Sequence, residues 1–72
     1  MSKTIQSPEY KILVSKLLKA RKEAGLTQIQ AARILKKSQS YVSKSETGEQ
    51  RLDVLELKRF ASVYKKPLSY FV

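Results

Sequence analysis

The sequence predicts one all-α domain, a compact bundle of four to five short helices. Apolar residues recur at helical spacing, and no long alternating run indicates a strand. The length of 72 residues suits a single domain, and only two glycines and two prolines interrupt it. We therefore expect a frayed start over residues 1–6 and one folded unit over residues 7–72.

The first helix should begin near Ser7 or Pro8, because serine caps a helix and proline suits its first turn. It should end before Gly25, which suits the left-handed residue that closes a helix. One face of this helix carries apolar side chains, namely Tyr10, Leu13, Val14, Leu17, Ala20 and Ala24. The opposite face carries four cations, Lys11, Lys16, Lys19 and Lys22.

Arg21 falls inside the apolar stripe of this helix. A guanidinium is always charged, so its burial is costly unless a carboxylate meets it. Either a carboxylate from elsewhere in the chain pairs with Arg21, or its side chain reaches water from the edge of the stripe.

The second and third helices are short and follow each other closely. Thr27 and Gln30 form a capping box that starts the second helix. Its narrow inner face comprises Ala31, Ala32 and Leu35. Ser38 caps the third helix, which should run to about Glu46 and end at Thr47 and Gly48.

The fourth helix should begin near Asp53, with Glu56 in its first turn at the positive end of the helix dipole. Its buried stripe comprises Leu57, Phe60, Ala61 and Tyr64. Pro67 prevents the helix from continuing. The last turn is apolar and should dock on the domain's own core or on a second subunit, and its candidate dimer-interface residues are Leu68, Tyr70, Phe71 and Val72.

The charge of the chain is strongly positive, with 15 Lys and Arg against 6 Asp and Glu, a net +9. Residues 1–37 hold nine cations and two anions, and residues 38–72 hold six and four. An excess of this size predicts a polyanionic partner, which could be nucleic acid, an anionic membrane surface or an acidic protein.

Several function classes lack the residues they need. Cysteine and histidine are absent, so we expect no disulfide, no metal site, no cofactor and no catalysis by these side chains. Glu46 and Glu49 are the only close carboxylates in the central region, so an acid–base pair and enzymatic activity are not expected. No apolar run exceeds three residues, which predicts neither a membrane span nor a signal peptide and favours a cytoplasmic protein.

Two short helices joined by a tight turn, from Thr27 to about Glu46, predict a helix-turn-helix. In this motif the second helix enters the major groove of DNA. Val42 should face inward, which leaves an outward face of Gln39, Ser40, Ser43 and Lys44. Such side chains suit base edges, since Gln pairs with adenine and Lys donates to guanine or to phosphate, and Tyr41 could reach a phosphate or a thymine methyl. A Ser- and Gln-rich face is also common on plain solvated helices, but the cap, the turn and the charge favour DNA.

The chain resembles the Xre family of Cro and phage-repressor helix-turn-helix proteins. The likeness extends from about Leu17 to Phe71 and is most specific between Ser38 and Asp53. The residues that carry it are Leu26, Thr27, Gln28, Ala32, Leu35, Ser38, Gln39, Ser40, Tyr41, Val42, Ser43, Lys44, Glu46, Gly48, Arg51, Leu52 and Asp53. Three positions depart from the family pattern: Lys36 replaces a turn glycine, Ala31 a leucine and Ser45 a large residue.

The resemblance implies a five-helix bundle that binds operator DNA, commonly as a dimer, and regulates transcription. It assigns base contacts to Gln39, Ser40, Ser43 and Lys44. It assigns phosphate contact or positioning to Gln28, Ser38, Tyr41, Thr47, Gly48 and Arg51. It pairs Arg21 with Glu46 in a buried ion pair, which would supply the carboxylate that the first helix demands.

We therefore expect a repressor that binds a near-palindromic operator in double-stranded DNA as a homodimer, in the cytoplasm and on the nucleoid of a bacterium, encoded by it or by a phage. An antitoxin that binds a toxin protein and represses its own operon would have the same fold. A membrane-surface helix is a weaker alternative, because the capped helices and Arg21 favour a folded bundle that hides the apolar stripe.

Overall fold

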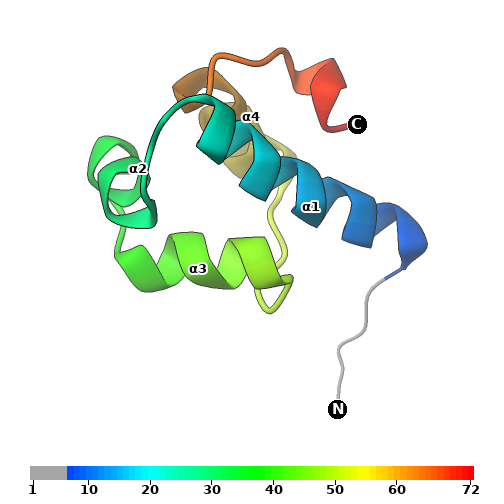
Figure 1. Cartoon of the computed structure of the whole chain (residues 1–72). Coiled ribbons are helices and arrows are strands. Elements are labelled where there is room, and N and C mark those ends of the chain that lie inside the picture. Colours follow the sequence, from blue (N-terminus) through cyan, green and yellow to red (C-terminus); the bar gives the residue numbers. More distant parts are fainter. Residues whose placement is uncertain (1–6) are drawn as a thin grey trace.

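The computed structural model describes residues 7–72, which fold into four α-helices and one short 3-10 helix. The elements are α1 (Pro8–Glu23), α2 (Gln28–Leu35), α3 (Gln39–Thr47), α4 (Val54–Val63) and η1 (Leu68–Tyr70). In Figure 1, α3 lies along one edge of the bundle, α2 stands at its start, and α1 and α4 lie above it. No strand occurs in this part of the chain, which confirms the all-α prediction, whereas residues 1–6 lie outside it.

Each α-helix begins at the side-chain cap that the sequence predicts. Ser7 and Ser38 accept hydrogen bonds from backbone N–H groups of the first turns of α1 and α3. Thr27 forms a reciprocal capping box with Gln30 at the start of α2. Asp53 forms a second box with Glu56 at the start of α4. These bonds satisfy backbone donors that have no partner inside a helix, so the boundaries are set locally.

The turn between α2 and α3 is as tight as the sequence requires. Lys36 adopts the left-handed conformation, with φ of 61° and ψ of 43°. The Lys37 N–H then donates to the Ala32 carbonyl at 2.9 Å. A lysine thus occupies a conformation that glycine adopts without strain, as expected for a turn of the usual geometry.

The core lies between all four α-helices and is built from the predicted stripes. Its fully enclosed large side chains are Leu17, Val42, Phe60 and Ser45. Ser45 replaces apolar bulk with a hydroxyl that donates to the Tyr41 carbonyl at 2.8 Å. Ala24 is a correction to the predicted stripe: it is exposed, because it caps the C-terminal end of α1 where the chain turns away.

The C-terminal segment completes the core of its own chain. Phe71 is only 4% exposed, which favours the alternative that it completes the domain's own core, and its place in a dimer interface stays a prediction. Leu68 and Tyr70 are half-buried against the core, and the Tyr70 ring meets Phe71 edge-on at 5.0 Å. Val72 remains 74% exposed. Tyr70 and Phe71 thus bury aromatic surface within the described chain.

Candidate nucleic-acid interface

Helix α3 is held by its inner face and presents its outer face to solvent. Val42 and Ser45 are fully buried. Three of the four predicted reading residues, Gln39, Ser40 and Lys44, are exposed, and Ser43 is half-buried. The structure therefore brings all four onto one helix whose opposite side is anchored.

Arg21 is paired with a carboxylate, as its place in the apolar stripe of α1 predicts. Its Nε donates to Glu46 Oε2 at 2.6 Å and its Nη2 to Glu46 Oε1 at 3.2 Å. Its third nitrogen, Nη1, donates to the Leu26 carbonyl at 2.8 Å. Arg21 is 9% exposed, so this is a buried two-pronged ion pair that ties α1 to the end of α3.

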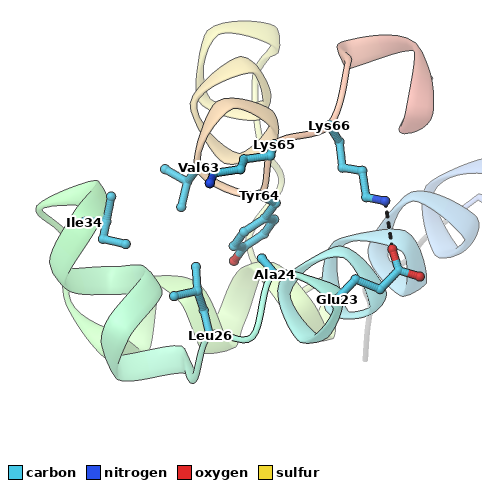
Figure 2. Close-up of a pocket in the computed structure, with 8 residues that line it drawn as sticks. All are labelled: Glu23, Ala24, Leu26, Ile34, Val63, Tyr64, Lys65 and Lys66. Atoms are coloured by element: carbon cyan, nitrogen blue, oxygen red, sulfur yellow. Dashed lines mark ion pairs between the residues drawn. The ribbon is translucent and has the colours of Figure 1, made fainter.

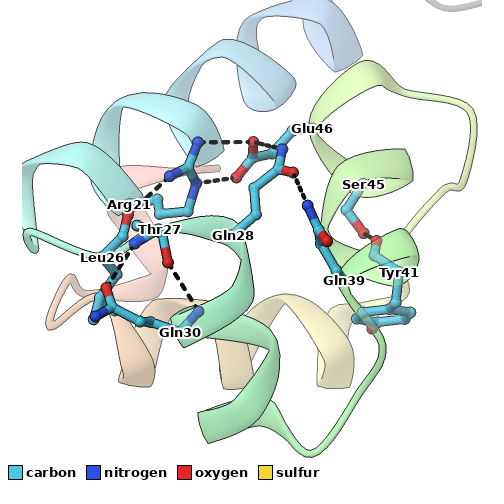
Figure 3. A network of polar contacts seen from close by, with 9 residues as sticks. All are labelled: Arg21, Leu26, Thr27, Gln28, Gln30, Gln39, Tyr41, Ser45 and Glu46. Carbon is cyan, nitrogen blue, oxygen red and sulfur yellow. Dashed lines mark hydrogen bonds and ion pairs between the residues drawn. The ribbon is translucent and has the colours of Figure 1, made fainter.

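Gln28 extends this ion pair to the start of α3. Its Nε2 donates to Glu46 Oε1 at 3.0 Å, and its Oε1 accepts from Gln39 Nε2 at 3.3 Å. Figure 3 shows the chain of contacts from Arg21 through Glu46 and Gln28 to Gln39. The Gln28 amide is oriented by its bonds to both Glu46 and Gln39, and its oxygen in turn limits the rotamers of Gln39.

Tyr41 faces α4 from the inner flank of α3. Its ring stacks on Phe60 with the centroids 5.9 Å apart, and its hydroxyl donates to Glu56 Oε2 at 3.2 Å. Burial and the adjacent Glu56 carboxylate raise the pKa of Tyr41 to about 12. Tyr41 therefore positions α3 against α4, whereas its direct contact with DNA stays a prediction.

The loop after α3 is organised around Tyr10. The Tyr10 hydroxyl accepts from the Leu52 N–H at 3.1 Å and donates to the Gln50 carbonyl at 3.4 Å. The guanidinium of Arg51 lies 4.3 Å from the centre of the Tyr10 ring. Sequence reasoning placed Tyr10 only in the core stripe, because nothing in the spacing of two residues 40 positions apart signals this contact.

Thr47 and Gly48 lead into the same loop. The Thr47 hydroxyl donates to the Lys44 carbonyl at 3.1 Å and accepts from the Glu49 N–H at 3.4 Å. Gly48 has φ of 85°, which ends α3 without the strain that a side chain would bring. The exposed Arg51 thus projects from a short, well-bonded connection.

A family model described as Helix-turn-helix matches residues 17–71. The chain belongs to the Xre, Cro and phage-repressor type of helix-turn-helix proteins. No curated protein matched the sequence.

As a member of this helix-turn-helix family, the protein is a DNA-binding transcription regulator. In a helix-turn-helix motif the second of the two helices enters the major groove, and α3 holds that position in this chain. Between residues 7 and 72, no helix combines the length and the apolar character that a membrane crossing needs.

Proposed function

We propose that the protein is a repressor that reads a near-palindromic operator through Gln39, Ser40, Ser43 and Lys44. The observation that carries this proposal is the continuous chain of contacts from the buried Arg21–Glu46 pair through Gln28 to Gln39. A base-reading amide gains discrimination when its orientation is fixed before binding.

Phosphate contacts would position the domain without reading sequence. Candidate groups surround the reading face on both sides. Gln28 and Ser38 flank its start, and Thr47, the Gly48 amide and Arg51 follow its end. The net charge of +9 supports binding that falls steeply as salt rises.

Dimerisation on DNA would place two copies of α3 about 34 Å apart, one duplex turn, on two half-sites. The exposed Val72 and the partly exposed edges of Leu68 and Tyr70 remain available for such a contact. Bound to an operator that overlaps a promoter, a dimer would repress by occlusion.

Fluorescence anisotropy with a labelled duplex from upstream of its own gene, against a scrambled duplex, tests the proposal. We expect tighter binding to the upstream duplex and a loss of affinity of at least about tenfold between 50 and 200 mM salt. Ser40→Ala and Lys44→Ala should reduce the preference between duplexes. Lys11→Ala, an equal loss of charge on the exposed side of α1, should leave that preference unchanged.

Equal binding to both duplexes, unaltered by Ser40→Ala and Lys44→Ala, would overturn the reading role of α3. Co-purification with a small second protein would then favour the antitoxin function.

A further inference from the structure

A groove lies between the turn from α1 to α2 and the C-terminal end of α4 (Figure 2). Its volume is about 470 Å³, within the range of pockets that hold small ligands. No residue of α3 lines it, so it is separate from the candidate DNA-reading face.

The groove combines apolar side chains with a charged rim that holds two lysines and Glu23. Leu26 and Val63 are half-buried, and Ile34 is 56% exposed, so apolar surface is accessible to a ligand in this groove. Lys65 and Lys66 stand on the rim. Lys66 Nζ is paired with Glu23 Oε1 at 2.8 Å, and Figure 2 shows Lys65 extended beside Val63.

Tyr64 supplies an independent sign of a ligand. It is 2% exposed, and its hydroxyl is the one buried side-chain polar atom of residues 7–72 without a hydrogen-bond partner. Figure 2 shows this hydroxyl between Ala24 and Leu26, two residues that line the groove. Buried hydroxyls are almost always satisfied, so an unsatisfied one beside a groove points to an acceptor from outside the chain.

We propose that this groove binds a small amphipathic anion. Its apolar body lies between Leu26, Ile34 and Val63, and its anionic head pairs with Lys65. An acceptor atom of the ligand receives a hydrogen bond from the Tyr64 hydroxyl once the Leu26 side chain moves aside. The chemistry fits an aromatic or aliphatic carboxylate or sulfonate, because one free cation, apolar walls and one buried donor match such a molecule.

The probe for the test is 1-anilinonaphthalene-8-sulfonate, an amphipathic anion whose fluorescence rises in apolar sites. It is titrated into the full chain, and the dissociation constant is measured for wild type and variants. We expect Ile34→Gln and Lys65→Gly each to weaken binding about fivefold or more, a change of roughly 1 kcal/mol. Tyr64→Phe should weaken it by a smaller factor, because it removes one hydrogen bond and no apolar surface.

Two matched controls separate the groove from general surface binding. Ile29 is 52% exposed on the same helix but does not line the groove, so Ile29→Gln should leave binding unchanged. The second control is Lys36→Gly. Lys36 has φ of 61° and Lys65 has φ of 60°, so this variant makes the same chemical change at an equivalent backbone conformation outside the groove, and probe binding should be unchanged.

Thermal melts of every variant confirm that the probe meets folded protein. Amide NMR shifts on probe binding should concentrate at residues 24–26, 34 and 63–66. Equal weakening by Ile29→Gln and Ile34→Gln, or by both glycine variants, would overturn the proposal. Shifts confined to other surfaces would overturn it as well.

Discussion

The Tyr10 hydroxyl binds the backbone on both sides of Arg51, while the Tyr10 ring lies 4.3 Å beneath the Arg51 guanidinium. One side chain of α1 thus holds both the loop and its cation. A flexible arginine loses side-chain entropy when it binds a phosphate, and the ring reduces that loss by restraining it beforehand. Tyr10 is therefore a positioning residue for the candidate phosphate contact.

Tyr10→Phe keeps the ring and removes both hydrogen bonds. We expect the free energy of unfolding to fall by about 1–2 kcal/mol, because two partly buried backbone groups lose their partner. DNA affinity should fall for the upstream and scrambled duplexes alike, since phosphate contacts carry no sequence information. Urea unfolding and anisotropy measure the two effects. Tyr70→Phe serves as control, and a Tyr10→Phe protein as stable as this control would contradict the role.

Glu46→Gln removes the charge that pairs with Arg21 and leaves a buried guanidinium uncompensated. The expected loss is about 3–5 kcal/mol, a large share of the stability of so small a domain. The double variant Arg21→Met with Glu46→Leu should recover most of it, because no unpaired charge remains. Thermal melts test both variants, and an unchanged melting temperature for Glu46→Gln would reject the buried pair.

Lys36→Gly should raise the free energy of unfolding by roughly 0.5–1 kcal/mol, because glycine adopts the left-handed turn conformation without strain. The gain is smaller than the strain released, since glycine also makes the unfolded chain more flexible. Urea denaturation measures the change in the free energy of unfolding. Lys37→Gly, next in the chain, should instead destabilise, and a loss for Lys36→Gly would show that the lysine side chain itself stabilises the turn.

Tyr64→Phe should leave stability unchanged or raise it by about 1 kcal/mol in the absence of ligand, because the hydroxyl is buried without a partner. Tyr41→Phe is the matched comparison, since that hydroxyl donates to Glu56 and its removal should cost stability. The melting temperatures of Tyr64→Phe and Tyr41→Phe test whether each hydroxyl contributes to stability. Equal losses would mean that both hydroxyls are bonded in solution.

Alkaline pH should weaken the fold through Tyr41. Its pKa is raised to about 12 by burial and by the Glu56 carboxylate, against 10.0 for an unperturbed tyrosine. Between these values the folded state holds a proton that the unfolded state has released. The stabilising contribution is therefore complete below pH 10 and is lost as pH rises toward 12. Tyr41→Phe should lose less stability than wild type between pH 9 and pH 11 in urea unfolding, and parallel losses would contradict this cause.

Local chemistry in the sequence determined where the helices lie. Caps at Ser7, Thr27, Ser38 and Asp53 act within one helical turn, so their residue types reveal them without knowledge of the fold. The strain at Lys36 followed instead from the resemblance, in which a glycine stands at this turn position, and the structure gives Lys36 a φ of 61°. The misplaced Ala24 lies at a helix end, where periodicity stops applying.

Part of the candidate site could also be predicted from the sequence, because a charged side chain in an apolar stripe needs a partner of opposite charge. Arg21 within an apolar stripe required a carboxylate, and Glu46 supplied it. The burial of Phe71 was left open between two alternatives, because an apolar tail suits either a core or an interface.

The sequence by itself determined the helices, the turn, the outward face of α3 and the need for an ion pair, since these depend on periodicity and on contacts between near neighbours. Only the tertiary structure decided the Tyr10–Arg51 stack, the burial of Phe71 and the unpartnered Tyr64 hydroxyl. Such contacts depend on how the helices cross, and crossing is set by the collective packing of the core, which no local pattern encodes.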